Sequence, residues 1–332
     1  MGKYSGKCRY IVCDVYSMID KHCRGKCQIS CKGGVGCHMR VFLAAFLSFD
    51  TLCSMLNQLL IAFGFSAIIV ALAYWRGSLS GSGAAGALLV GTLTFGLGGW
   101  QWGVVLGVFF VSSSLLSHYK EAEKRTAAEK FDKGHRRDMG QVFANGGLGT
   151  IIAVLSAVVP TTAVATQTWF YLFVGVMGTV TADTWATELG TLSKSPPRLI
   201  TNGKPVDVGT SGGVSPLGTL VSFLGGLLIG LTAGLLTDYN LLLTALAGAL
   251  GGLVGSLFDS LLGATVQQIY YCDSCEKDTE RKVHKCGTTT RPLRGWSWLN
   301  NDVVNLLASV VGGVTATLIL LSTSVAFAVL IL

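Results

Sequence analysis

The sequence predicts an all-α protein that crosses a membrane about eight times. Half of its 332 residues are hydrophobic, only 13% are charged, and the mean hydropathy is +0.55. This composition is typical of a polytopic membrane protein. A third observation is a series of apolar runs, each of a length that matches the ~30 Å hydrocarbon core of a bilayer.

Six of the apolar runs are each suited to a single span. They lie at 56–75, 142–160, 168–189, 214–236, 240–262 and 303–325. The run from Ala84 to Leu116 is too long for one span. Its centre, GLGGWQW at 96–102, has glycines for a turn and tryptophans suited to the membrane interface. We therefore expect a hairpin of two shorter helices there, which brings the total to about eight.

Positive charge gathers in three connecting segments, at 118–140, 193–213 and 272–295. With eight spans, these segments and Arg76 fall on one face, and the loops of the opposite face hold only one charged residue, Asp238. Because positively charged loops tend to stay in the cytoplasm, we expect the basic face to be cytoplasmic. The match between charge and topology supports the span count.

The first 54 residues form a basic extension that holds seven of the ten cysteines. One interpretation is that 41–53 adds a membrane element, although this stretch is short and contains Asp50. The interpretation we favour is that the extension is not part of the working protein and that synthesis begins at Met55. The working domain is then 55–332. The spacing of the cysteines at 8, 13, 23, 27, 31 and 37 matches no zinc pattern.

Two carboxylates lie inside an apolar run, where an ionisable group is costly unless it is paired or faces a cavity. The stretch DTWATELG at 183–190 contains Asp183 and Glu188. Five residues correspond to about 140° around a regular helix, so the two side chains do not share a face. Either the helix unwinds near Gly190, or only one of them reaches a site.

Further polar residues occur near the same predicted face. Asp259 lies late in a second glycine-rich span, within GSLFDSLLGATVQ. The stretch NNDVVN at 300–305 places Asn301 and Asn305 one helical turn apart, with Asp302 beside them. Clustered carboxylate and amide oxygens suit Mg²⁺, which proteins often bind together with substrate phosphates.

The loop after the span that contains Asp183 and Glu188 can supply groups that bind phosphate. It contains Arg198, Lys204 and GTSGG at 209–213, just before a helix expected to begin near Val214. Exposed backbone amides and a helix N-terminus attract anions. A plain turn between spans would use the same glycines and serine, and the loop alone does not distinguish these interpretations.

A similar pair opens an earlier span. In GHRRDMGQVFANGG, Gln141 and Asn145 are one turn apart and follow Arg136 and Arg137. The two arginines could reach phosphate, or they could be attracted to anionic lipid headgroups. The small residues around Asn145 also suit simple helix packing.

Four motifs occur in a fixed order: DTWATELGTLS, GTSGGVSPLGT, GSLFDSLLGATVQ and LNNDVVN. In this order they resemble the transmembrane protein nineteen family, which includes a plant phytyl-phosphate kinase, and the resemblance runs from Met55 to the C-terminus. It implies that an isoprenoid monophosphate is phosphorylated to its diphosphate with a nucleoside triphosphate as donor. A weaker resemblance, to dolichol and phytol kinases and CDP-lipid synthases, rests on the spacing of Asp183, Ala186 and Gly190 and also implies nucleotide use.

These observations lead to one functional hypothesis. The protein is expected to be an integral membrane kinase that uses CTP or ATP and Mg²⁺ to phosphorylate phytyl, geranylgeranyl or a related prenyl phosphate. The candidate catalytic and metal-binding residues are Asp183, Glu188, Asp259, Asn301, Asp302 and Asn305, with Mg²⁺ held mainly by Asp183 and Asp259. The candidate nucleotide-binding residues are Asn145, Arg198, Lys204, Gly209, Thr210, Ser211, Gly212 and Gly213. The prenyl chain is expected between the glycine-rich helices and the bilayer.

Two alternatives stay open. One is a CDP-lipid synthase, which would use the same metal and nucleotide and release diphosphate. The other is an ion-coupled transporter, which also places carboxylates in glycine-broken helices. Polar groups at one face and the lack of an internal sequence repeat favour the enzyme. Membrane lipids are expected partners and nucleic acid is not; the sequence does not indicate an oligomeric state.

The segment 270–295 has a separate pattern of cysteine and histidine. Cys272 and Cys275 form a C-x-x-C pair, and His284 and Cys286 follow with one residue between them. Three thiolates and an imidazole suit a tetrahedral structural zinc in a loop resembling a zinc ribbon. The alternative is a reduced cysteine pair on a basic hairpin. A disulfide is disfavoured because the loop is predicted to be cytoplasmic.

Overall fold

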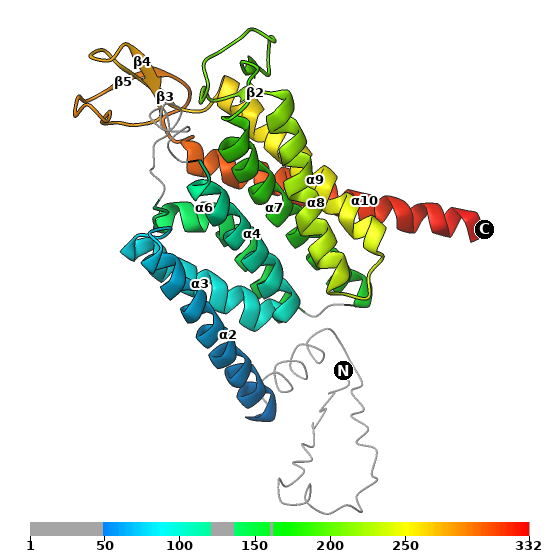
Figure 1. Ribbon diagram of the computed structural model, residues 1–332. Helices are drawn as coiled ribbons and strands as arrows, with labels where there is room; N and C mark the ends of the chain where they lie inside the picture. Colours follow the sequence, from blue (N-terminus) through cyan, green and yellow to red (C-terminus); the bar gives the residue numbers. More distant parts are fainter. Residues whose placement is uncertain (1–48, 121–135, 160–161, 332) are drawn as a thin grey trace, which may run out of the picture. The chain divides into compact units, whose positions relative to one another are not determined.

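The computed structural model of the protein describes residues 49–120, 136–159 and 162–331 (Figure 1). The chain divides into two units, Met1–Leu52 and Cys53–Leu332, and nearly all described residues belong to the second. The predictions made for the N-terminal cysteines lie outside the described residues, and so does most of the stretch 41–53.

Eight helices of the described part are long and apolar enough to cross a membrane, as the sequence predicted. They are α2 (Phe49–Trp75), α3 (Gly81–Gly98), α4 (Trp100–His118), α6 (Met139–Val158), α7 (Ala163–Gly190), α8 (Pro216–Leu235), α9 (Leu241–Thr265) and α10 (Asn301–Ile331). The first of them begins at Phe49, upstream of the predicted start at residue 56. The protein is therefore a polytopic helical membrane protein.

The predicted hairpin is present between α3 and α4. Gly99 alone separates the two helices, and its φ of 100° lies in a region that residues with a side chain rarely adopt. The amide of Gly99 donates to the carbonyl oxygen of Phe95 at 3.0 Å, which closes the end of α3. A single glycine thus turns the chain back through the membrane.

Local sequence signals fix where two of the later helices begin. At α6, the side chains of Asp138 and Gln141 each accept a hydrogen bond from the other's backbone amide, which is a capping box. At α8, the hydroxyl of Ser215 accepts from the amide of Gly218, and Pro216 occupies the first turn. This helix begins next to its predicted start near Val214.

Helices α7, α8, α9 and α10 pack through glycine at very short distances. A Cβ atom on Gly230 of α8 would lie 2.5 Å from the carbonyl oxygen of Thr244 in α9, and one on Gly178 of α7 would lie 2.8 Å from that of Gly248. The Thr179 hydroxyl of α7 donates to the carbonyl oxygen of Gly251 at 3.2 Å. Small residues and interhelical hydrogen bonds of this kind are the usual means of packing helices in a membrane.

Helices α2, α3, α4 and α6 pack differently, mainly through side chains. The hydroxyls of Thr94 in α3 and Thr150 in α6 form a buried hydrogen bond of 2.9 Å. Helix α2 leans on α3 through Phe65 and Phe95, whose ring centroids lie 5.9 Å apart. Only 11% of the α2 span is buried, against 50% or more for the spans of α7, α8 and α9. The outer helix is therefore loosely attached.

Short strands lie in the connections at one end of the bundle (Figure 1). Between α7 and α8, β1 (Arg198–Leu199) pairs with β2 (Gly213–Val214). Between α9 and α10, β3 (Ile269–Cys272), β4 (Lys277–Thr279) and β5 (Arg291–Arg294) form an antiparallel sheet in the order β4-β3-β5. By connectivity, α2, α4, α7 and α9 end at this face, and α3, α6, α8 and α10 begin there.

Candidate functional site

A polar pocket of about 360 Å³ lies at the end of the bundle that carries the strands. Its walls come from α4, α6, α7, α8, α9 and α10, together with the segment just before α6 and the loops that follow α7 and α9. It brings together most of the residues predicted from the sequence. Those that line it are Asn145, Asp183, Glu188, Gly209, Thr210, Ser211, Gly212, Gly213, Asp259, Asn301, Asp302 and Asn305.

Two predicted residues, Arg198 and Lys204, are not among those that line the pocket. Both are exposed on the hairpin that contains β1. The guanidinium of Arg198 donates to the carbonyl oxygen of Gly203 at 2.9 Å, because the turn folds back over the strand. The two charges expected to contact phosphate from this loop therefore lie outside the pocket.

Three carboxylates form an acidic group on one side of the pocket. Asp183 comes from α7, Asp259 from α9 and Glu280 from the loop after β4, and their charges act on one another. When the side-chain amide of Asn305 in α10 is assigned the orientation that satisfies its hydrogen bonds, its nitrogen donates to Asp259 Oδ2 at 2.9 Å. The carboxylate of Asp259 is thus held by the neighbouring helix.

Glu188 lies on another side of the same pocket. The Ser117 hydroxyl of α4 donates to Glu188 Oε1 at 2.7 Å, and the charge of Arg137 acts on this carboxylate. Helix α7 stays helical as far as Gly190, yet both Asp183 and Glu188 line the pocket. The expectation that only one would reach the site unless the helix unwound was wrong, because the pocket is wide enough to surround much of the helix end.

Glu280 was missed by the sequence analysis. Its Oε1 atom accepts hydrogen bonds of 2.8 Å from the hydroxyl of Ser211 and from the amide of Gln267. These bonds join the glycine-rich loop, the end of α9 and the Cys/His loop at one carboxylate. The residue stands in a basic loop with no recognisable spacing. The only signal available was its position between the predicted zinc ligands.

The glycine-rich loop 209–213 is folded against the end of α9. Gly212 has a φ of +85°, and a Cβ atom there would overlap Ala264, so only glycine fits. The amides of Thr210 and Gly213 already donate to carbonyl oxygens within the turn, which contradicts the expectation that the whole segment offers free amides. Among the described residues, the amides of Gly209, Ser211 and Gly212 have no hydrogen-bond acceptor.

Three helices begin at the pocket and direct their N-termini toward it. Gln141 of α6, Ser215 at the start of α8 and Asn301 of α10 all line its wall. A helix N-terminus carries partial positive charge, so it favours anions. The pocket therefore combines carboxylates that suit a cation with helix ends that suit phosphate.

Arg137 and Lys285 are the basic residues that line the pocket in the described part of the chain. Arg137 stands between the end of α4 and the start of α6. Burial lowers the pKa of Arg137 to about 10, while the carboxylate of Glu188 opposes this shift. Its neighbour Arg136 does not line the pocket and instead lies over the ring of Tyr74 at 5.9 Å.

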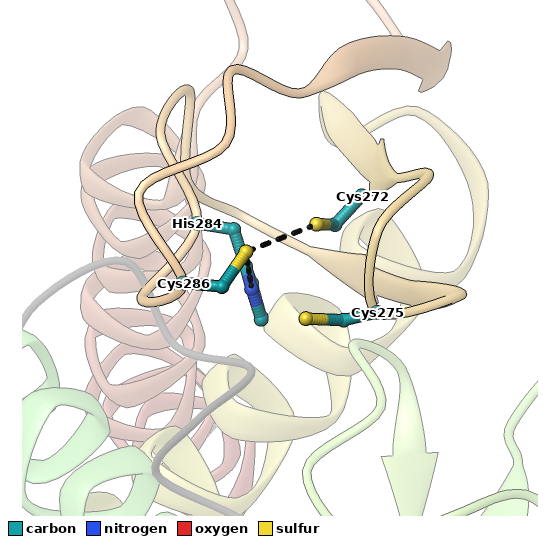
Figure 2. A group of neighbouring side chains, drawn as sticks. All are labelled: Cys272, Cys275, His284 and Cys286. Carbon is teal, nitrogen blue, oxygen red and sulfur yellow. Dashed lines mark hydrogen bonds between the residues drawn. The ribbon is translucent and has the colours of Figure 1, made fainter.

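The four predicted zinc ligands converge in the loop after α9 (Figure 2). The ligand atoms of Cys272, Cys275, His284 and Cys286 all lie within 4.8 Å of one another. Hydrogen bonds from Thr288 and His284 lower the pKa of Cys286 to about 5, whereas a hydrogen bond with Cys286 raises the pKa of Cys275 to about 11. A central cation would relieve the crowding of these thiolates.

The geometry defines an integral membrane protein with a polar pocket at one face of its helical bundle. The chain belongs to the family described as integral membrane protein DUF92, whose model matches residues 64–313. All the pocket residues named above lie in this range, and so do the four ligands of the Cys/His loop.

Several relatives cover most of the chain. Protein PGR of Arabidopsis thaliana is 35% identical over 274 residues, which is 76% of this chain and 92% of that protein. An uncharacterized membrane protein of Methanocaldococcus jannaschii is 31% identical over 243 residues, or 73% and 85% of the two chains. Protein VTE6, chloroplastic, of Arabidopsis thaliana is 28% identical over 243 residues, or 72% and 65%. No solved structure matches.

Proposed function

We propose that the protein is a membrane phosphotransferase that converts a prenyl phosphate to its diphosphate at the expense of CTP or ATP. The observation that carries this proposal is the shared pocket, which brings an acidic group and three helix N-termini together at one end of the helical bundle. A magnesium nucleotide needs both kinds of group. A prenyl substrate such as phytyl or geranylgeranyl phosphate is what the four ordered motifs imply through their resemblance to a family that includes a plant phytyl-phosphate kinase.

Asp183, Asp259 and Glu280 are the residues that would hold Mg²⁺. Mg²⁺ prefers oxygen ligands and usually binds one or two carboxylates together with substrate phosphates, which fits this group. Bound there, it would neutralise charge on the nucleotide phosphates. The side-chain amide of Asn305 holds the carboxylate of Asp259, so we assign Asn305 a positioning role.

The nucleotide phosphates would lie against the glycine-rich loop and the N-termini of α8 and α10. The amides of Gly209, Ser211 and Gly212 and the ammonium group of Lys285 are the donors available there. Catalysis of phosphoryl transfer depends mainly on such positioning and charge neutralisation.

The reaction requires little covalent chemistry from the protein. An oxygen of the lipid phosphate attacks the terminal phosphorus of the nucleotide, and the bond to the bridging oxygen breaks. The nucleoside diphosphate leaves with that oxygen and its electron pair. The acceptor phosphate is already ionised at neutral pH, so no strong general base is required. The basic face that holds the site is proposed to be cytoplasmic, where nucleotides are available.

Zinc is proposed as a second, structural ion. Three thiolates and one imidazole make a closed four-ligand site with no open position for substrate, so its role would be to shape the loop. That loop carries Glu280 and Lys285 into the pocket. The zinc would therefore support catalysis from a distance.

The proposal is tested with the purified full chain, Mg²⁺, geranylgeranyl or phytyl phosphate, and CTP or ATP labelled on the terminal phosphate. Label should appear in a prenyl diphosphate, and Asp183→Asn should abolish the transfer. Asp238→Asn is the matched control, because Asp238 is an exposed carboxylate at the opposite end of the bundle. Thermal unfolding of both variants confirms that they are folded.

The other outcomes separate the alternatives. Label that enters the lipid only from the α-phosphate of CTP, with release of diphosphate, would identify a CDP-lipid synthase. If folded protein transferred no label from either donor to either acceptor, the kinase proposal would be refuted, and an ion-coupled transporter would become the leading alternative.

A further inference from the structure

A second cavity lies beside the polar pocket, among α2, α3, α4 and α6. Its volume is about 720 Å³, within the range of roughly 300–1,000 Å³ typical of small-molecule sites. Apolar side chains such as Phe65, Phe95 and Phe110 form most of its wall. The loose attachment of α2 leaves this space unfilled. A wall of this kind suits a hydrocarbon chain.

The two cavities share three residues. Arg137, Gln141 and Asn145 line both the apolar cavity and the polar pocket. Apart from Ser66 and Ser112, all other side chains that line the apolar cavity are apolar or aromatic. The charged and amide groups are thus confined to the boundary with the polar pocket. A ligand that filled both spaces would be an amphiphile with its polar head at this boundary.

The backbone holds Arg137 firmly at the boundary. Its amide donates to the carbonyl oxygen of Ser78, and its own carbonyl oxygen accepts from the amide of Ser80, both at 3.0 Å. A Cβ atom on Gly83 would collide with that carbonyl oxygen, so the start of α3 closes tightly over the segment. The backbone of Arg137 is therefore held by the connection between α2 and α3 and by the start of α3.

The guanidinium of Arg137 still has a buried donor to satisfy. Its Nη1 atom is buried and has no hydrogen-bond partner among the described residues. The group packs against the rings of Phe109 and Phe110, each at 5.7 Å from its centroid, which hold it in place but accept no strong hydrogen bond. A buried, unsatisfied cationic donor is costly, and an anion with free oxygen atoms would satisfy it.

We propose that the two cavities together form the binding site of the acceptor lipid, with its phosphate on Arg137 and its prenyl chain in the apolar cavity. The amides of Gln141 and Asn145 provide further contacts at the phosphate. This inference rests on the proposed function, since it places the acceptor phosphate across the polar pocket from the acidic group that would hold the nucleotide. It also places the prenyl chain of the lipid among α2, α3, α4 and α6.

Binding is measured without nucleotide, so that it does not depend on turnover. The full chain is placed in phosphatidylcholine nanodiscs and titrated with labelled geranylgeranyl phosphate. Arg137→Gln should weaken binding about tenfold or more, because it removes charged hydrogen bonds. Arg136→Gln is the matched control and should bind as the parent protein does, since Arg136 lines neither cavity.

The placement of the prenyl chain in the apolar cavity is tested with substitutions at two glycines. Gly107 lines the apolar cavity, and a Cβ atom there meets nothing within 4 Å, so Gly107→Leu fills the cavity without a backbone clash. Gly64 of α2 is equally open but does not line the cavity. Gly107→Leu should weaken binding of the lipid phosphate, while Gly64→Leu should not.

Competitors identify the part of the ligand that is recognised. Geranylgeraniol should compete weakly because it lacks the phosphate, and inorganic phosphate should compete weakly because it lacks the chain. If inorganic phosphate displaced the lipid fully, or if Gly107→Leu bound the lipid phosphate normally, the placement of the prenyl chain in the apolar cavity would be overturned. Normal binding by folded Arg137→Gln would overturn the head assignment.

The failure of this inference can be told apart from the failure of the proposed function. Binding that is lost in Arg137→Gln and Gly107→Leu, in a protein that transfers no phosphate, would support the lipid site and refute the kinase. If the protein transfers phosphate, and Arg137→Gln and Gly107→Leu both bind the lipid normally, the kinase proposal would be supported and this lipid site would be refuted.

Discussion

The two halves of the helical bundle are packed by different means. Helices α7 to α10 approach so closely that an added Cβ atom at Gly178 or Gly230 would contact the backbone of a neighbouring helix. In α2 to α6, Gly64 and Gly107 face open space, and an apolar cavity of about 720 Å³ remains. Helices α7 to α10 are therefore held together by backbone contacts, whereas α2 to α6 leave room for a ligand.

This difference matches what each half holds. Asp183 and Asp259 come from the closely packed helices α7 and α9, whose backbones approach each other at Gly178 and Gly248. Arg137 and the apolar cavity belong to the looser half. Positioning of reacting groups requires rigidity, while entry of a long lipid chain requires a gap that can open. The polar pocket lies where the two halves meet.

The largest effect is expected at the acidic group of the pocket. Glu280→Gln should lower the rate of phosphate transfer by about 10²–10³-fold, because it removes a charge that would stabilise the reacting phosphates through the metal. Binding of Mn²⁺, measured as a magnetic probe in place of Mg²⁺, should weaken in parallel. Binding of the lipid phosphate should stay unchanged, since Glu280 does not line the apolar cavity.

Glu276 provides the matched control for this substitution. It lies between β3 and β4 in the same connection from α9 to α10, but it is exposed and does not line the pocket. Glu276→Gln should therefore leave both transfer and Mn²⁺ binding as they are. Equal losses in the two variants would show that the loop tolerates no change of charge, and would remove the special role assigned to Glu280.

A smaller effect, on stability, tests the packing difference itself. Gly230→Ala places a methyl group against the backbone of α9 and should destabilise the protein by about 1–3 kcal/mol, as overpacking usually does. Gly107→Ala should instead stabilise it by about 0.5–1 kcal/mol, because alanine favours the helix and meets no obstacle. Thermal unfolding of both variants in the same detergent measures the direction of each change in stability. Shifts of the same sign would contradict the proposed difference.

The sequence predicted the helices well, because apolar length is a direct signal of a span. The turn at Gly99 lies within the predicted stretch GLGGWQW, and α6 and α8 begin close to the predicted starts at residues 142 and 214. The polar residues of the pocket were also recognisable, since an ionisable side chain at membrane depth has few structural explanations.

The errors in the predicted site come from tertiary structure. Arg198 has the right charge and position in the sequence, yet the hairpin at Gly203 binds its guanidinium. Glu280 had no local signal, because its partners Ser211 and Gln267 lie in other segments. The apolar cavity was equally invisible, since it depends on how α2 leans against α3. Sequence patterns describe elements, whereas these features arise between them.

The smallest expected effect concerns the Cys/His loop. If zinc holds this loop, the purified protein should contain one zinc ion per chain, and His284→Ala should lose it. Transfer should then fall about tenfold, a loss typical of residues that support a catalytic group indirectly. The loss should be smaller than that of Glu280→Gln, because Ser211 and Gln267 still bind the carboxylate when the loop loosens.

His284→Cys is the matched control for the zinc experiment. Four thiolates also bind zinc tetrahedrally, so this variant should retain the metal and nearly full activity. Zinc content measured by mass spectrometry then separates loss of the ion from loss of the histidine. Full activity in a zinc-free His284→Ala variant would show that the rest of the fold positions Glu280. In that case the closely packed helices, together with the hydrogen bonds from Ser211 and Gln267 to Glu280, would determine the geometry of the acidic group without a bound zinc ion.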